Sequence, residues 1–156
     1  MVQVLPKTRN EWSRAMNASA RSGQWKKALD LIAEMPRRKI SPSVVDYNTV
    51  IAACKKARRW DMGIRMLREM KAVKVMPDVI TYNTAISGCA RSKQWEIAMK
   101  LLEEMQSEGL RPDVISYNAC ITALEKGSQW KKAVELLKQM KIQGLKPDVI
   151  SYLNNF

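Results

Sequence analysis

Hydrophobic positions along the chain recur with the period of an α-helix. Between residues 82 and 90, apolar or small side chains occupy positions i, i+3, i+4, i+7 and i+8, the stripe of an amphipathic helix. A second such stripe runs from residue 98 to residue 105, after the short polar segment 91–94. Gly109 and Pro112 then end the second helix, because glycine favours a helix C-terminus and proline prevents continuation. The pattern predicts a helical hairpin.

The hairpin recurs along the chain with a period of 35 residues. The columns that share this period are Trp25, Trp60, Trp95 and Trp130; Met35, Met70, Met105 and Met140; and Pro42, Pro77, Pro112 and Pro147. One hairpin of this size cannot bury both of its apolar stripes, so neighbouring units must stack. The sequence therefore predicts an all-α solenoid of stacked helix-turn-helix hairpins.

The same period sets the boundaries of the units. We expect a lead at residues 1–8, an atypical first repeat at 9–43, repeats at 44–78, 79–113 and 114–148, and the start of a fifth repeat at 149–156. Residues with a side-chain oxygen recur near the start of each first helix, where we expect helix N-caps: Asp46, Thr81, Ser116 and Ser151. The first repeat has Glu11 in this column, which predicts a less well-defined helix start.

Three segments resemble the pentatricopeptide repeat family. They are VDYNTVI at 45–51, ITYNTAI at 80–86 and ISYNACI at 115–121, and the later Glu-Met and Pro-Asp pairs agree with the family pattern. The 35-residue unit separates this family from the 34-residue tetratricopeptide repeat, whose W-x-x-L-G-x-x-Y signature is absent. The resemblance covers residues 9–148. It implies a right-handed α-solenoid that binds single-stranded RNA on its concave side, in RNA processing, stability or translation in mitochondria or chloroplasts.

The resemblance also implies which residues read the RNA. In the family the fifth and last residues of a repeat face one base together. The pairs in this sequence are Ser13 with Ser43, Asn48 with Asp78, Asn83 with Asp113, and Asn118 with Asp148. An Asn–Asp pair favours uracil in the family, so three consecutive repeats imply a U-rich tract. The resemblance assigns no base to the Ser–Ser pair of the first repeat. A carboxamide suits this role because it carries both donors and an acceptor.

Two further columns complete the expected RNA site. In relatives the second residue of a repeat sandwiches the base, and Val45, Ile80, Ile115 and Ile150 occupy that column, with polar Asn10 in the first repeat. Arg21, Lys56, Arg91 and Lys126 recur once per repeat at the end of the first helix. One cation per repeat matches one phosphate per nucleotide, and relatives use a lysine in this column.

Composition narrows the possible functions. Lys and Arg number 27 against 15 Asp and Glu, a net charge of +12 that favours an anionic partner. The absence of histidine excludes imidazole catalysis, and Cys54, Cys89 and Cys120 lack metal-site spacing and are expected to be buried. We expect no enzyme activity, cofactor, metal, small-molecule substrate or membrane span, and no targeting segment is visible.

Other interpretations of these signals remain open at the sequence level. The Asn and Asp columns also suit helix caps and turns, and the basic column suits a solvated face. The tryptophans would suit base stacking, although packing is favoured because they begin the second helices. The main alternative function is a protein–protein interaction scaffold, since stacked hairpins offer grooves to peptides. Protein partners in an RNA-processing complex, and a nuclease arm with its catalytic domain elsewhere, are also compatible.

Overall fold

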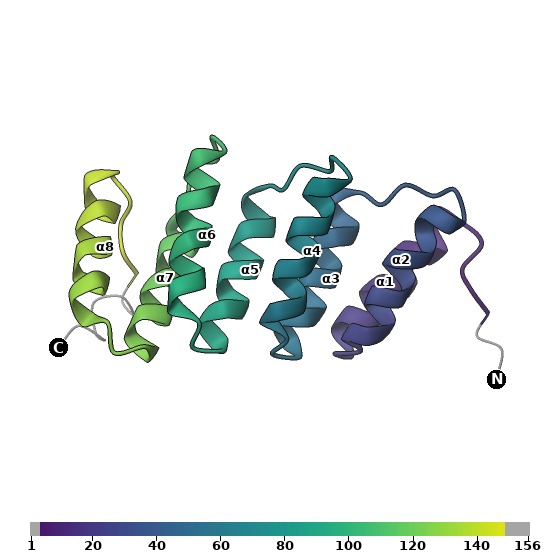
Figure 1. Ribbon diagram of the computed structural model, residues 1–156, viewed down its shortest axis with the longest axis horizontal. Helices are drawn as coiled ribbons and strands as arrows, with labels where there is room; N and C mark the ends of the chain where they lie inside the picture. Colours follow the sequence, from purple (N-terminus) through teal and green to yellow (C-terminus); the bar gives the residue numbers. More distant parts are fainter. Residues whose placement is uncertain (1–3, 149–156) are drawn as a thin grey trace. The chain divides into compact units, whose positions relative to one another are not determined.

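The computed structural model describes residues 4–148, in which eight α-helices and no strand are found. The helices are α1 (Arg9–Arg21), α2 (Trp25–Arg37), α3 (Val44–Lys56), α4 (Trp60–Ala72), α5 (Val79–Arg91), α6 (Trp95–Ser107), α7 (Val114–Lys126) and α8 (Trp130–Ile142). They fall into two compact units, Met1–Met76 with α1–α4 and Pro77–Phe156 with α5–α8. Each unit contains two helical hairpins (Figure 1), so the all-α class is confirmed.

Each unit is held together by one helix that packs against both helices of the neighbouring hairpin. In the first unit α3 contacts α1 and α2 as well as its own partner α4. In the second unit α7 contacts α5 and α6 as well as α8. The apolar stripe of a first helix is therefore shared between two hairpins, as expected for hairpins that cannot bury their stripes alone. In each unit, the first helix of the second hairpin, α3 or α7, is therefore the central helix.

Fully buried side chains repeat with the unit length in both units. The side chains of Met35, Met70, Met105 and Met140 are all completely buried, as interhelix filler. The three cysteines are free and buried. Burial raises the pKa of the Cys54 thiol to about 11 and that of the Cys89 thiol to about 12, and it also raises the pKa of Cys120. These thiols act as small apolar side chains.

The N-caps lie three residues before the column in which the sequence placed them. Ser43, Asp78 and Asp113 cap α3, α5 and α7, and the residues expected as caps are their capping-box partners at the third helical position. The expected weak start of α1 is also wrong, because Thr8 caps that helix through the backbone N–H of Glu11. The error arose because a capping box has oxygens at both of its ends, and the sequence pattern alone does not say which end is the cap.

Each hairpin uses residues in the left-handed region to end its helices. One such column, just after the first helices, contains Gly23, Arg58, Lys93 and Ser128, with φ between 56° and 70°. A second column, after the second helices, contains Lys39, Lys74, Gly109 and Gly144, with φ between 60° and 78°. In both columns the chain reverses direction within a few residues, which explains the short polar breaks in the hydrophobic pattern.

In each unit, the tryptophan that begins the second helix of the first hairpin is covered by a cation of the following hairpin. The Arg59 guanidinium lies 4.6 Å from the Trp25 ring centre, and the Lys132 ammonium lies 4.1 Å from that of Trp95. Gly127 also lies against the Trp95 indole, so closely that an added Cβ would overlap the ring. These contacts support the packing interpretation of Trp25 and Trp95 over base stacking. Trp130 is 65% exposed.

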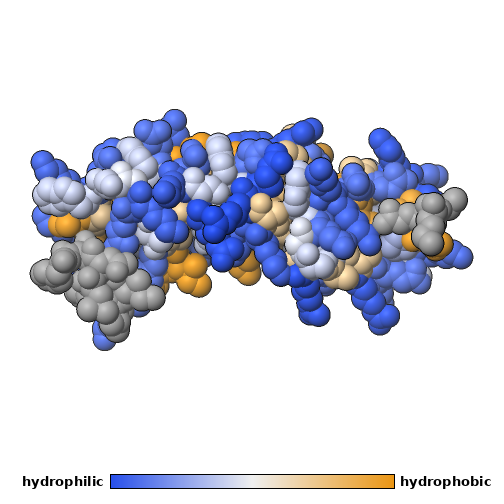
Figure 2. Space-filling view, turned by 90° about the horizontal axis from the view of Figure 1, so that it is seen from below, coloured by the Kyte–Doolittle hydropathy of each residue, from blue (hydrophilic) through white to orange (hydrophobic). Residues whose placement is uncertain are grey.

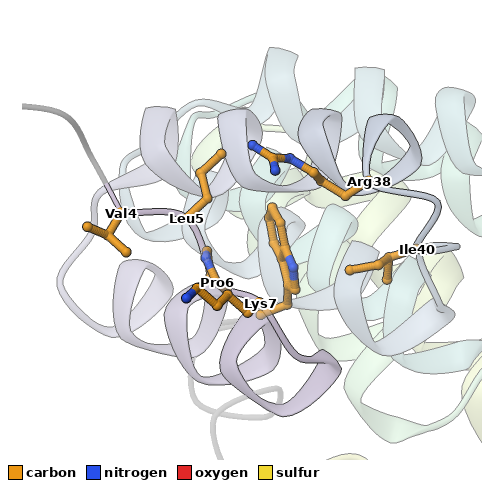
Figure 3. A pocket seen from close by; sticks show the side chains of 7 residues that line it. Val4, Leu5, Pro6, Lys7, Arg38 and Ile40 are labelled. Carbon is orange, nitrogen blue, oxygen red and sulfur yellow. The ribbon is translucent and has the colours of Figure 1, made fainter.

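The lead segment covers the first hairpin. Trp12, in the column occupied by tyrosine in the later repeats, is fully buried, and its indole N–H has no hydrogen-bond partner. Figure 3 shows side chains of the lead and of the segment that follows α2 around a pocket on the first hairpin. This open pocket has a volume of about 570 Å³ and is lined by Val4, Leu5, Pro6, Lys7, Trp12, Arg38 and Ile40. The first repeat thus differs from the others in its packing as well as in its sequence.

Gly63, the fourth residue of α4, offers a direct test of the packing between α3 and α4. An added Cβ would lie 3.8 Å from Ile51 Cγ2 and 3.9 Å from Cys54 Cβ, which are ordinary contacts. Because glycine costs a helix interior about 1 kcal/mol relative to alanine, we expect Gly63→Ala to raise the free energy of unfolding by about that amount. Urea denaturation measures it, and a decrease would show that the two helices are closer than described.

Candidate nucleic-acid interface

Asn83 and Asp113 form a hydrogen-bonded pair between neighbouring repeats of the second unit. Asn83 lies in the second turn of α5, and Asp113 is the N-cap residue of α7. Asn83 Nδ2 donates to Asp113 Oδ1 over 3.0 Å, and the same oxygen accepts the Ser116 backbone N–H over 3.0 Å. Partial burial acts to raise the pKa of Asp113, but these hydrogen bonds outweigh it and the pKa is lowered. The carboxylate is therefore an acceptor at neutral pH.

Ser116 holds the other end of the same carboxamide. This buried hydroxyl lies 2.5 Å from Asn83 Oδ1, and it also accepts the Asp113 backbone N–H over 3.1 Å. Asn83 as a whole is only 8% exposed. The sequence analysis assigned Ser116 to capping alone. Ser116 recurs as Thr81 and Ser151, always two residues before the Asn column or its equivalent. This recurrence was the sequence signal that could have linked the hydroxyl to the Asn–Asp pairs.

The last complete pair has the same contact in a more open setting. Asn118 Nδ2 donates to Asp148 Oδ2 over 2.7 Å, and Asp148 is exposed. Asn48 lies on α3 of the first unit, whereas Asp78 caps α5 of the second, so each of these residues is described within its own unit. Within the second unit, a direct hydrogen bond therefore joins both of the predicted Asn–Asp pairs.

The predicted pair of the first repeat is not joined in this way. The Ser13 hydroxyl donates to the Arg9 carbonyl of its own helix over 3.2 Å. The Ser43 hydroxyl donates to Asp46 over 2.7 Å and accepts from the Arg9 guanidinium over 3.0 Å. Arg9 also forms an ion pair with the buried carboxylate of Asp46. The later repeats have valine where this repeat has Arg9, and the sequence analysis missed the arginine because its pairing depends on a residue 37 positions away.

Aliphatic side chains project into solvent beside these pairs. Val45, Ile80 and Ile115 are 70%, 63% and 60% exposed, although each belongs to a helix with a buried stripe. Their recurrence at one position per repeat separates them from scattered surface apolar residues. Ile150, the fourth member of the predicted column, lies outside the described residues, and Asn10 of the first repeat is exposed. Ile80 and Ile115 belong to the same unit as the Asn83–Asp113 pair.

The four basic residues of the predicted ladder are all exposed and end the first helices of their hairpins. The residues are Arg21, Lys56, Arg91 and Lys126. Lys56 Nζ also donates to the Arg21 carbonyl, so this lysine additionally satisfies an end of α1. In the unit of α1–α4, the turns within the two hairpins lie on the lower side in Figure 1, the side that Figure 2 faces. Hydrophilic residues predominate there (Figure 2).

Two kinds of feature are absent from residues 4–148. No group of three or more His, Cys, Asp or Glu side chains is placed to hold a metal ion. Among the same residues, no helix has both the length and the apolar character that crossing a membrane requires.

The fold and the repeated columns define an α-helical repeat protein, and comparisons with known proteins identify the family. A model described as PPR repeat family matches residues 42–91, 77–126 and 112–153, and a model described as pentatricopeptide repeat domain matches residues 14–57. The chain therefore belongs to the pentatricopeptide repeat family. No curated protein matches it in sequence.

Solved structures confirm the predicted fold. The crystal structure of maize PPR10 matches with a TM-score of 0.85 and 24% identity, over 96% of this chain and 22% of that one. PPR10 in complex with an 18-nucleotide psaJ RNA element matches with a TM-score of 0.82 and 29% identity, over 99% of this chain and 23% of that one. This chain thus spans less than a quarter of the PPR10 chain.

A third solved structure with a similar fold is a domain of a protein-only RNase P. The pentatricopeptide repeat domain of Arabidopsis thaliana protein-only RNase P 1, in complex with tRNA, matches with a TM-score of 0.80 and 19% identity. The match covers 92% of this chain and 76% of that domain. At this identity the likeness concerns the fold alone.

Proposed function

We propose that the chain binds single-stranded RNA, with one nucleotide per repeat and a preference for uridine-rich tracts. The observation that carries this proposal is the Asn83–Asp113 hydrogen bond in a unit that also exposes Ile80 and Ile115. An amide held by a carboxylate offers a defined donor and acceptor to a base edge, and exposed aliphatic side chains offer a surface for its faces. The RNA complex of PPR10, 29% identical, supports the choice of ligand.

The preference for uracil follows from the atoms that Asn83 leaves available. One Nδ2 hydrogen is donated to Asp113, so the amide retains one N–H donor and a lone pair on Oδ1. The Watson–Crick edge of uracil has a central N–H donor flanked by two carbonyl acceptors, which matches one acceptor beside one donor. Asn118 makes the same contact with a carboxylate, that of Asp148. The two sites would therefore select the same base.

Binding of this kind predicts occupancy of transcripts rather than catalysis. Following the family, we place this role in RNA processing, stability or translation in mitochondria or chloroplasts. Imaging of the tagged gene product in cells tests the organellar assignment. Signal confined to another compartment would overturn it without affecting the proposed chemistry.

Fluorescence anisotropy with short oligoribonucleotides tests the proposed activity. We expect U-rich RNA to bind more tightly than A-, C- or G-rich RNA and than DNA of matching sequence. Four neutralised phosphates give an expected slope of log affinity against log salt of about −3. Equal affinity for all sequences would contradict base reading. No binding even at low salt would contradict RNA binding altogether and favour a protein-interaction scaffold.

The basic ladder makes a separate prediction. Arg91→Ala is expected to weaken binding to all sequences by the same factor and to make the salt slope shallower by about 0.7, the contribution of one phosphate on a single strand. Arg111→Ala removes the same charge from an exposed position outside the ladder and serves as the matched control. Titrations at several salt concentrations measure both variants. A loss confined to one base, or equal slopes for both variants, would contradict a phosphate contact at Arg91.

A further inference from the structure

Asn83, Asp113 and Ser116 are linked by a closed set of hydrogen bonds. The Asp113 backbone N–H lies 3.1 Å from Ser116 Oγ, and this hydroxyl lies 2.5 Å from Asn83 Oδ1. Asn83 Nδ2 in turn donates to Asp113 Oδ1 over 3.0 Å. A serine hydroxyl has one proton, and Asn83 Oδ1 is closer to it than Asp113 Oδ1, which lies at 3.0 Å. The hydroxyl therefore accepts from the Asp113 backbone and donates to Asn83.

This arrangement fixes which end of the amide faces which neighbour. Rotation of the amide by 180° would place Asn83 Oδ1 against the Asp113 carboxylate, two acceptors without a proton between them. It would also cost the Ser116 hydroxyl its acceptor at 2.5 Å, Asn83 Oδ1, and leave its proton only the more distant Asp113 Oδ1 at 3.0 Å. Asp113 therefore opposes the rotation at the Nδ2 end of the amide, and Ser116 opposes it at the Oδ1 end.

The orientation of the amide matters because uracil and cytosine differ in the order of their hydrogen-bonding groups. Uracil presents a donor at N3 and an acceptor at O4, whereas cytosine presents an acceptor at N3 and a donor at N4. An amide that rotates freely satisfies either base by exchanging its oxygen and nitrogen. An amide with a fixed orientation satisfies one of them.

We propose that Ser116 is a positioning residue that makes the Asn83 site discriminate uracil from cytosine. The hydroxyl comes from the repeat after the one that supplies Asn83, so three residues rather than two set the base preference. This inference rests on the proposed RNA-binding function. It concerns selectivity between pyrimidines and leaves the affinity for the U-rich tract mainly to the other contacts.

Ser116→Ala tests the proposal in the full chain. The probes are oligoribonucleotides with a central U-U-U tract in which each uracil is replaced in turn by cytosine. For the unmodified protein, we expect each replacement to weaken binding. For Ser116→Ala, we expect the penalty to fall by about two- to tenfold at one nucleotide only, the range that one hydrogen bond supplies. Ser116→Thr keeps the hydroxyl and is expected to restore the penalty.

Because Ser116 also belongs to the capping box of α7, a loss of stability has to be separated from a loss of selectivity. Thr8→Ala removes a hydroxyl that caps α1 in the other unit and controls for this effect. We expect it to lower the melting temperature without changing any cytosine penalty. An unchanged penalty in Ser116→Ala, with uracil still preferred by the unmodified protein, would overturn the role of Ser116. No uracil preference in the unmodified protein would instead overturn the proposed function.

Discussion

Replacement of Asn83 with threonine is expected to move the base preferred by the third repeat from uracil to guanine. Threonine removes the amide that occupies Asp113 Oδ1, so the carboxylate regains an acceptor site. Guanine offers two adjacent donors, N1–H and the N2 amino group, to the carboxylate and the new hydroxyl, whereas uracil offers one. We expect a change of about tenfold in the ratio of the two affinities, within the range known for a single base mismatch.

Binding to oligoribonucleotides with single U-to-G replacements measures this change. Only one position of the tract should switch, while the position that faces Asn118 keeps its preference for uracil. Asn118→Thr is the matched variant and should switch a neighbouring position instead. Unchanged preference at every position, in a variant with an unchanged circular dichroism spectrum, would contradict the assignment of Asn83 to base reading.

Replacement of Gly127 with alanine is expected to lower the free energy of unfolding by about 1 to 3 kcal/mol, the usual cost of an overpacked contact. Gly127 has a negative φ of −87°, which any residue can adopt, so backbone strain does not cause the expected loss of stability. The new methyl group would overlap the Trp95 indole, which Lys132 covers from the same hairpin as Gly127. The ring must therefore move and lose part of its packing. Urea denaturation monitored by circular dichroism measures the loss.

A second variant separates this overlap from a general effect of the substitution. In a Trp95→Ala background the obstacle is absent, and Gly127→Ala is expected to be neutral or slightly stabilising. Trp95→Ala alone should be destabilising, because it removes the contact with Lys132. If the cost of Gly127→Ala were the same in both backgrounds, the close approach of the indole would not be its cause.

The fold was predictable because its elements are encoded locally and repeated. The stripe from Tyr82 to Ala90 and that from Ala98 to Met105 became α5 and α6, and the 35-residue period extended the assignment to all hairpins. The caps were harder to place. Asp113 and Ser116 both offer oxygens to backbone N–H groups, and only the backbone conformation shows that Asp113, with φ −105° and ψ −176°, is the residue outside the helix.

The candidate site was predictable in its columns and unpredictable in its connections. The Asn and Asp positions followed from the repeat period and the family resemblance. That the Ser116 hydroxyl turns towards Asn83 depends on the approach of two hairpins, which periodicity does not encode. The same holds for Arg9, which bonds Ser43 and Asp46 where the sequence suggested a Ser13–Ser43 pair. All three residues differ from those of the later repeats in their columns, and together they form a different set of hydrogen bonds.

Asp113 occupies two positions at once, as the last residue of one repeat and the first N-cap of the next. Ser43 and Asp78 have the same double position. Only a few short polar side chains cap helices well, namely Asp, Asn, Ser and Thr. Under the proposed function, substitutions made here to change the preferred base are therefore limited to that small set. Any other residue would weaken the start of the following helix. The requirement for an N-cap at the start of each first helix thus limits which residues can stand at the last position of the preceding repeat.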